Sequence, residues 1–482
     1  MVLALLLGGV ACQTETGKPP VTGSVTDGTA TSVLEETTEV LRPELPEKDM
    51  DGRIFTILCT DWAGYSPLEI TDIFVEQDSE DAIESATFYR NIHVSEKFKC
   101  QVEKMDCQAG QEYLTISAAN RSGDCPYDIT LVRCQNFNAL VSGGALMDLD
   151  DLPYTDFSSP WWNEEAYDAL SILGRHFGAT SDITMNDDLA TWVTFFSKNL
   201  ITDNNLESPY DLVEAGQWTM DKMYSMAKTV AQDVDNNGMV YENDIWGIEH
   251  IRDNFTGMLN SCDILIAENN QEGIPTFTID SEASVTKILH IFELLYDKDT
   301  VINMHVMGSG IDEVDPFMEN RVLFFVAGLY QGNKLRNMDY PYGIIPLPKY
   351  DEAQTDYLGS SSGLFTTLVT IPAVVYNLDD LGIFLEEYTW YGYEEIRPVF
   401  YNNLLERKIA YDDESAEMLN YIFDHMIYDT GNIGNYARLA EDLIWMTQDY
   451  NKGISSFLAG KLTAAKRQVD KMVNAVNNYE GS

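Results

Sequence analysis

The sequence predicts an α/β protein built from two domains. Its 482 residues exceed what one ordinary hydrophobic core organises, so two domains are expected. The composition, 45% hydrophobic and 22% charged, is that of a globular chain. In the first part of the chain, apolar runs of strand length alternate with segments of helical periodicity. This alternation is typical of a parallel, doubly wound sheet flanked by helices, with ligands at the carboxyl ends of its strands.

Five segments establish the alternation. Residues 53–60 (RIFTILCT) have the apolar run of a buried strand, and residues 81–99 repeat apolar side chains at helical spacing. A second strand is expected at 100–105, a helix at 112–120 and a third strand at 127–133. A helix between two strands is the connection that makes the strands parallel neighbours in one sheet.

The chain becomes more helical from about residue 181. Thr219 can cap a helix whose buried stripe consists of two methionines, an alanine and a valine. A methionine stripe is typical of a core face. The members of this stripe are Met220, Met223, Ala227 and Val230.

Further strands are expected in the second half. The apolar runs at 322–327 and 343–347 have strand length, and Pro348 stops the second. A longer apolar stretch covers 364–376, and helical segments dominate from 378 to the end. No sequence repeat of the length found in solenoids or propellers is present.

The charge balance restricts the partners. The chain has 78 acidic and 30 basic side chains, a formal charge of -48 and a pI near 4.2. Such a field repels phosphate backbones, so nucleic acid is not an expected partner. Few cations remain to clamp an anionic ligand, which leaves neutral or cationic small molecules. The acidity is equally explained as a means of keeping an extracellular surface soluble.

The N-terminal residues have the pattern of an export signal. Residues 2–10 form a short apolar run, and small residues lead directly to Cys12. Residues 1–12 resemble the signal peptide and lipobox of bacterial lipoproteins, which implies lipidation of Cys12 and an anchor on the outer face of the cytoplasmic membrane. Residues 13–50 are rich in Thr, Glu, Pro, Gly and Ser and predict a disordered tether. An ordinary secretory signal with an incidental cysteine is the alternative.

Six cysteines remain if Cys12 is lipidated. Disulfides are permitted outside the cell, but spacing alone does not give their pairing. Buried free thiols are the alternative, above all for Cys59 and Cys134, which lie in or beside predicted strands. The six are Cys59, Cys100, Cys107, Cys125, Cys134 and Cys262.

A calcium loop is predicted at 233–244. Oxygen ligands stand at loop positions one, three and five, Gly238 stands at six for the tight turn, and a carboxylate stands at twelve. That carboxylate belongs to Asp244, which is shorter than the usual Glu. A structural Ca²⁺ is therefore expected, and a solvated turn is the alternative. The expected ligands are Asp233, Asp235, Asn237, Met239 and Asp244.

A serine-hydrolase motif is present in outline at 359–363 (GSSSG), which fits G-x-S-x-G around Ser361. The nucleophile elbow needs a strand before it and a helix after it. Here the preceding residues are polar and the following run predicts a strand, so we interpret the segment as a loop or hinge. The six histidines include no pair at helical metal-site spacing, and we expect no catalytic residues.

Four stretches together resemble one protein family. They are 128–132 (DITLV) with the following GGALMDL at 143–149, then 210–219 (YDLVEAGQWT), 317–325 (FMENRVLFF) and 342–348 (YGIIPLP). In order and spacing this sequence resembles the extracellular solute-binding proteins of family 1, the group that includes maltose-binding protein. The resemblance extends over nearly all of residues 51–480.

The resemblance implies a two-lobed, periplasmic-binding-protein-like fold in which hinge crossovers connect two α/β lobes. The N-terminal lobe would comprise 51–178 plus 359–397, and the C-terminal lobe 179–358 plus 398–482. Crossovers are expected near Gly178, Gly359 and Arg397.

The family's ligand contacts follow particular strands, and their counterparts here are Asp61, Trp62, Gln135, Asn136, Phe137 and Tyr330. Trp161 and Trp162 are secondary candidates near the implied cleft. The Tyr-Asn-Lys common early in the second lobe of the family is Phe-Ser-Lys at 196–198, which changes the polar pattern of the pocket.

The function implied is that of an extracytoplasmic substrate-binding lipoprotein of a bacterial ABC importer. It would bind a neutral sugar or oligosaccharide between the lobes, with the ring stacked on aromatic side chains, and deliver it to the permease subunits. Such a protein is not an enzyme. An oligopeptide-binding lipoprotein and a surface-anchored hydrolase are the alternatives.

Overall fold

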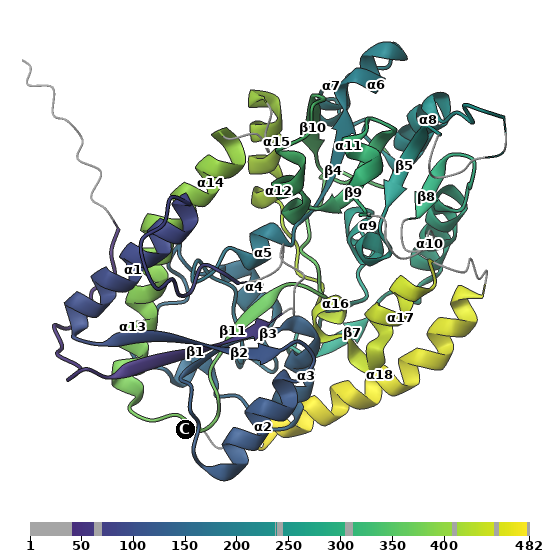
Figure 1. Ribbon diagram of the computed structural model, residues 1–482. Coiled ribbons are helices and arrows are strands. Elements are labelled where there is room, and N and C mark those ends of the chain that lie inside the picture. Colours follow the sequence, from purple (N-terminus) through teal and green to yellow (C-terminus); the bar gives the residue numbers. More distant parts are fainter. Residues whose placement is uncertain are drawn as a thin grey trace, which may run out of the picture. The chain divides into compact units, whose positions relative to one another are not determined.

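The computed structural model describes residues 41–61, 70–236, 238, 244–303, 312–406, 412–447 and 453–479. By its contacts the chain divides into two units, Met1–Arg42 and Pro43–Ser482, and every element named below belongs to the second. The predicted signal peptide, with Cys12, and most of the predicted tether lie outside the described residues. Figure 1 shows the arrangement of the elements.

The first sheet has four strands within the described residues, in the order β11-β3-β1-β2. β1 runs parallel to β2 and to β3, whereas β11 is antiparallel to β3. The strands are β1 (Ile54–Asp61), β2 (Gln101–Gln108), β3 (Ile129–Arg133) and β11 (Thr367–Thr370).

Local sequence explains this part of the fold. The apolar run of β1 is buried at successive positions 57–60, as a strand covered on both faces should be. Helix α1 (Ala82–Phe98) begins where the Asp81 carboxylate accepts hydrogen bonds from the backbone N–H groups of Ile83 and Glu84. It ends at Lys99, whose φ of 53° is the left-handed conformation that terminates helices.

The second sheet has five strands in the described part of the chain, in the order β10-β4-β9-β5-β8. β5 is parallel to β8 and β9, and β4 is antiparallel to β9 and β10. A separate antiparallel pair is formed by β6 (Ala267–Asn269) and β7 (Pro275–Phe277). The five strands are β4 (Trp192–Ser197), β5 (Trp246–His250), β8 (Val301–Asn303), β9 (Val322–Gly328) and β10 (Tyr342–Ile345).

Helices connect the strands and cover them. Those that follow α1 in the first part of the chain are α2 (Glu112–Ser122), α3 (Cys134–Ser142), α4 (Glu164–Ala169), α5 (Asn186–Leu189), α6 (Lys198–Asp203), α7 (Pro209–Glu214), α8 (Met220–Val230), α9 (Phe255–Ser261) and α10 (Glu282–Leu295). The later ones are α11 (Asp315–Met318), α12 (Gly332–Leu335), α13 (Leu378–Tyr391), α14 (Arg397–Glu406), α15 (Asp413–Asp424), α16 (Thr430–Gly434), α17 (Leu439–Trp445) and α18 (Ile454–Asn477).

Two helix contacts organise the lobes. α1 and α13 lie side by side against the first sheet, as Figure 1 shows. The long C-terminal helix α18 packs against α3, which follows the first sheet, and against α10, which precedes β8 of the second. The segment 398–482, predicted to belong to the C-terminal lobe, therefore includes a helix that contacts elements of both lobes.

The predicted elements are present, but the sheets are not purely parallel. The expectation of a parallel, doubly wound sheet is corrected by β11 in the first sheet and by β4 and β10 in the second. β11 enters the first sheet from the far half of the chain by a crossover, without an intervening helix that would return it to the parallel direction. The mixed α/β class itself is confirmed.

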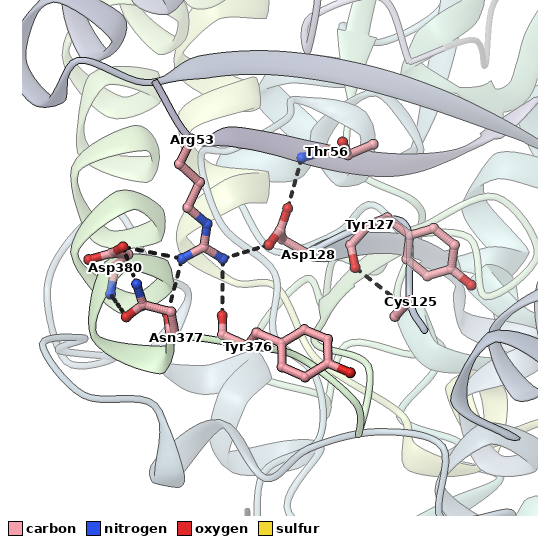
Figure 2. A network of polar contacts seen from close by, with 8 residues as sticks. All are labelled: Arg53, Thr56, Cys125, Tyr127, Asp128, Tyr376, Asn377 and Asp380. Atoms are coloured by element: carbon pink, nitrogen blue, oxygen red, sulfur yellow. Dashed lines mark hydrogen bonds and ion pairs between the residues drawn. The ribbon is translucent and has the colours of Figure 1, made fainter. Parts of the chain in front are cut away.

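One polar network fastens the amino ends of β1, β3 and α13 together (Figure 2). The Arg53 guanidinium donates to the Asp128 carboxylate at 2.7 Å and to the backbone carbonyls of Tyr376 and Asn377 at 3.1 and 3.2 Å. The other Asp128 oxygen accepts from the backbone N–H of Thr56 at 3.0 Å. A single side chain thus links three segments that are more than 70 residues apart.

The six cysteines of the described chain carry free thiols, and most are buried. Burial raises the pKa of the Cys100 thiol to about 11 and that of Cys262 to about 12, so both stay protonated at neutral pH. Among the described residues, no helix is long and apolar enough to cross a membrane.

Candidate ligand-binding site

A cavity of about 370 Å³ lies where the chain passes between the two sheets. Its wall comes from five stretches of chain: 160–165, 181–188, Ser361, 397–401 and 423–428. The wall combines aromatic rings, carboxylates and one guanidinium, which is the mixture of side chains that ligand sites use to hold and orient a polar molecule.

The crossover between Ala179 and Trp192 supplies the centre of this wall. At one end Ala179 bridges to Val369 of the first sheet, and at the other end Trp192 begins β4 of the second. Between them the backbone of Thr191 bridges to Ser361, which lies in a second crossover. The two crossovers are therefore hydrogen-bonded to each other beneath the cavity.

A bulge in the α13–α14 region places a cation against this crossover. Residues Gly392–Ile396 form a π-helical turn, and α14 then begins with Arg397. Arg397 donates to the Asp182 carboxylate at 3.1 Å. Gly392 allows this approach, because a Cβ there would lie 1.8 Å from the Asp182 carbonyl oxygen.

Three carboxylates of the crossover share this wall and interact. Burial raises the pKa of Asp182 to about 7, although the nearby Arg397 guanidinium opposes the rise. Burial also raises the pKa of Asp188 to about 6, with Arg397 again opposing it. The pKa of Asp187 lies well above its usual value because of burial and the charges of Asp188 and Asp182. Burial thus opposes ionisation of all three carboxylates, and Arg397 counteracts it at Asp182 and Asp188.

Two tryptophans are fixed at the edge of the cavity by one buried carboxylate. Trp161 Nε1 and Trp162 Nε1 donate to separate oxygens of Glu386 at 2.9 and 3.0 Å, and Glu386 is 1% exposed. Burial raises the pKa of Glu386 to about 7, although both indole N–H groups oppose the rise. The neighbouring Asn163 donates through Nδ2 to the Tyr428 hydroxyl at 2.5 Å, which ties this edge to the opposite wall.

Ser361 is not arranged as a nucleophile. Its hydroxyl donates to the backbone carbonyl of Asp187 at 2.9 Å and lies 3.2 Å from the Thr191 hydroxyl. No strand precedes it and no helix follows it directly in the described structure, as the sequence context predicts. His425 belongs to the stretch 423–428, which forms part of the cavity wall. Its Nδ1 contacts the Tyr421 carbonyl, and its ring stacks on Tyr421.

The sequence-predicted contacts do not come together around this cavity. Asp61 ends β1 and lines a different cavity, of about 360 Å³, with Phe74 and Lys104. Trp62 lies outside the described residues. Gln135 and Asn136 are partly exposed in the first turn of α3.

Phe137 and Tyr330 lie in the core instead of a cleft. Phe137 is 3% exposed, and its ring leaves room only for glycine at 178, where a Cβ would lie 2.9 Å from Phe137 Cε2. Tyr330 is fully buried, with its ring edge-on to Phe365. α3 begins immediately after β3, so the residues predicted to form a contact loop form a packed helix. The secondary candidates Trp161 and Trp162 do line the cavity, whereas the sequence analysis did not identify the acidic crossover.

The predicted calcium loop has the geometry of a cation site in its described residues. The carboxylate oxygens of Asp233, Asp235 and Asp244 all lie within 4.8 Å of one another. Asp233 accepts from the Gly238 N–H at 2.8 Å, and the fully buried Asp244 accepts from the Val234 N–H at 2.9 Å. Gly238 has a φ of 93°, as the tight turn requires. Asn237 and Met239 lie outside the described residues.

No family model matches the chain, and no curated protein matches it. Solved structures of other proteins do match the chain. An ABC substrate-binding protein from Listeria monocytogenes, in complex with cycloalternan, is 14% identical over 89% of this chain and all of its own, with a TM-score of 0.54.

Two further solved structures are similar to the same extent. The GacH receptor of Streptomyces glaucescens, solved unliganded and with acarbose, is 14% identical over 89% of this chain and all of its own, with a TM-score of 0.53. UspC of M. tuberculosis is 13% identical over 86% of this chain and all of its own, with a TM-score of 0.56. The chain thus has the two-lobed fold of extracellular solute-binding proteins, which confirms the fold that the resemblance implied.

The Glu386 contact predicts a loss of stability in Glu386→Gln. The two indole N–H groups donate to different carboxyl oxygens, and an amide offers only one oxygen, so one indole loses its acceptor. We expect a loss of about 1–3 kcal/mol in the free energy of unfolding, measured by urea unfolding with tryptophan fluorescence. Glu165→Gln removes an exposed carboxylate at the same cavity and is the control.

The same variant should change the pH dependence of stability. Because the pKa of Glu386 is about 7 in the folded protein and near 4.5 when unfolded, the folded state holds the proton more tightly. Its contribution to wild-type stability therefore declines as pH rises from about 5 to about 7. Glu386→Gln should lack that part of the slope, and a slope equal to that of the wild type would contradict the assignment.

Proposed function

We propose that this chain is the extracytoplasmic substrate-binding lipoprotein of a bacterial ABC importer, and that it binds a sugar or oligosaccharide and delivers it to the permease. The observation that carries the proposal is the cavity of about 370 Å³ at the crossovers of a solute-binding fold. The similar structures include complexes with cycloalternan and with acarbose, which support a carbohydrate as the ligand class.

The lining of the cavity suits a sugar. The apolar C–H face of a sugar ring packs on aromatic rings, and its hydroxyls donate to carboxylates. Tyr401 and Tyr428 are partly exposed beside the crossover carboxylates, and Trp162 lies at the opposite edge. Asp61, Trp62, Gln135 and Asn136 stay proposed contacts from the second candidate region at the carboxyl ends of β1 and β3.

Binding without turnover follows from the same wall. Ligand contacts to elements of both sheets favour a closed arrangement over an open one, which is what a permease can distinguish. The Ser361 hydroxyl is engaged with a backbone carbonyl, so the alternative of a surface hydrolase lacks an activated nucleophile. We therefore assign binding and delivery, and no catalysis.

The lipid anchor and the bound calcium complete the proposal. Cys12 would carry the acyl chains, and the residues between it and Pro43 would form the tether that keeps the two-lobed part close to the outer face of the cytoplasmic membrane. The predicted tether of residues 13–50 is too long at its end, because residues 43–50 belong to the folded unit and Met50 is buried in its core. Asp233, Asp235 and Asp244 fit Ca²⁺ because their oxygens converge within 4.8 Å and one of the three carboxylates is fully buried. When bound, the ion neutralises these carboxylates and ties the strand that follows to the preceding helix α8.

A titration decides the ligand class. A thermal-shift screen over sugars and short peptides selects the best ligand, and isothermal titration then measures Kd. Tyr401→Ala should weaken sugar binding by about 1–3 kcal/mol through loss of an aromatic contact. Tyr340→Ala, an exposed tyrosine away from the cavity, is the matched control.

Trp62→Ala in the same titration separates the two candidate regions, since only one of the two variants should weaken binding if the regions do not form one site. Stabilisation by peptides with no response to any sugar would contradict the carbohydrate assignment and favour the oligopeptide alternative.

Calcium should stabilise the folded chain. Binding to the native state alone adds about 2.7 kcal/mol at a hundredfold excess over Kd, so chelator should lower Tm. Asp235→Asn removes an exposed carboxylate from the group and should abolish the calcium response while leaving the chelated protein as stable or slightly more stable, because like charges are separated. An unchanged Tm on adding chelator would show that the loop is only a turn.

Changing Cys12→Ala should release the protein from the membrane. The acyl chains contribute about 0.8 kcal/mol per buried methylene, and two chains hold a protein where the apolar run alone does not. Cell fractionation and metabolic labelling with a fatty acid are the measurements, with Cys59→Ala as the control for a buried thiol. Membrane retention without acyl label in the wild type would contradict the anchor.

A further inference from the structure

The wall of the cavity is strongly acidic. Six carboxylates face one guanidinium, that of Arg397, among the described residues that line it. Such a wall disfavours anions. The net charge of the chain is compatible with neutral and with cationic ligands, and the wall distinguishes between these two classes. The six are Glu164, Glu165, Asp182, Asp187, Asp188 and Asp424.

Arg397 compensates only part of the charge at the centre of this wall. It is hydrogen-bonded to Asp182, whose side chain is 11% exposed. Within the described residues, no hydrogen bond or ion pair reaches the Asp188 carboxylate, although Asp188 lies in the same short helix as Asp187 and is only partly exposed. These two adjacent carboxylates thus have no hydrogen-bonded cation among the described residues, although the Arg397 guanidinium also acts on Asp188 at longer range.

The fold holds these carboxylates in place. The Asp187 carbonyl accepts hydrogen bonds from the hydroxyls of Thr191 and Ser361, so the short helix is fastened to both crossovers. Asn186, at the start of the helix, accepts from the Thr367 N–H at 2.9 Å. The backbone that carries the two carboxylates is thus held in place by the connection between the sheets.

A neutral sugar leaves this charge uncompensated. Its hydroxyls can donate to the carboxylates, but the repulsion between them remains in a partly desolvated site. A protonated amine supplies both hydrogen-bond donors and the missing charge, and the tyrosine and tryptophan rings beside it can pack on a sugar ring or contact the cation.

Resting on the solute-binding function above, we propose that the ligand carries a positive charge and that Asp187 and Asp188 hold its cationic group. An amino sugar, with a free amine on its ring, has this chemistry. The acidic wall thereby replaces the neutral sugar expected from the sequence with a cationic one.

Matched ligand pairs test the charge. Glucosamine, galactosamine, mannosamine and the glucosamine disaccharide are each titrated against the full chain beside the N-acetylated form and the parent hydroxyl sugar. N-acetylation removes the charge and keeps the ring. Spermidine supplies charge without a sugar ring. We expect at least one amine to bind about tenfold or more tightly than its N-acetylated partner, with a preference that weakens at high salt.

Variants locate the charge. Asp187→Asn combined with Asp188→Asn should reduce the preference for the amine about tenfold or more, whereas Glu272→Gln, at an exposed carboxylate that is not part of the cavity lining, should leave it nearly unchanged. If the double variant does not fold, Asp188→Asn alone is used, because within the described residues the Asp188 carboxylate accepts no hydrogen bond that the change would break. An undiminished preference in a folded variant overturns the assignment.

Affinity for the amine should fall as pH is lowered from about 7 to about 5, a range over which the amine of the ligand keeps its proton, because protonation of the carboxylates removes the charge that holds it. The groups facing Asp187 and Asp188 from the surrounding elements are Asp182, Arg397, Tyr401, Tyr428, Glu164, Glu165 and Asp424. Arg397 keeps its charge over this range, so the direction of the change is set by the acids.

The outcomes separate the two proposals. A neutral or N-acetylated sugar that binds as tightly as any amine overturns the cationic ligand and leaves the carbohydrate function standing. Binding of spermidine with no response to any sugar overturns the carbohydrate function and supports the charge assignment. Failure of every cationic member of the panel to bind overturns the charge assignment, whatever the neutral members do.

Discussion

The crossover from Ala179 to Trp192 is the constraint on which the rest of the structure depends. It begins at Ala179, which pairs with Val369 of the first sheet, and it ends at Trp192, the first residue of β4 in the second sheet. Between these residues it contains three partly desolvated carboxylates. Arg397 and the backbone of the second crossover hold this segment in place. The segment is hydrogen-bonded at both ends and along its length. It therefore fixes the walls of the cavity relative to both sheets.

Close packing keeps that passage narrow. Gly392 lies so near the Asp182 carbonyl that any side chain would displace the π-helical turn, and with it Arg397. Gly178 admits the Phe137 ring in the same manner at the start of the crossover. Gly178 thus admits close packing by Phe137 of α3, and Gly392 admits the close approach of the turn after α13 to Asp182. The contact with Gly178 explains why Phe137, predicted to contact a ligand, is needed as packing.

Periodicity predicted the elements whose burial pattern is local. Residues 81–99 gave α1 with Asp81 and Lys99 as its two ends, and the methionine stripe gave α8 with the Thr219 cap. It could not predict the direction of β11, because an antiparallel strand and a parallel one have the same apolar run, and direction depends on where the connection comes from. The fold class was therefore accessible, and the mixed pairing was not.

The site was less accessible for a different reason. In a chain with 78 acidic residues, the three carboxylates at 182, 187 and 188 have no distinguishing spacing, and only the fold shows that they share one cavity with Arg397 from over 200 residues away. Trp161 and Trp162 were visible as a pair, but their acceptor Glu386 lies on α13 and has no local signal. The grouping of Asp233, Asp235 and Asp244 could be predicted because these carboxylates fall within one short segment.

The raised pKa values connect the carboxylates of the cavity to stability. For Asp182 the folded pKa is about 7 and the usual value is 3.8, so the folded state binds more protons between these limits, and the site becomes more costly as pH rises through them. A bound cation would reverse this dependence of stability on pH, because it favours the ionised carboxylates, which the unliganded protein disfavours. The free energy with which the fold opposes ionisation is thus recovered when a ligand of opposite charge arrives. Under the proposal of a cationic ligand, the groups that weaken the unliganded protein near neutral pH are the ones that hold the ligand.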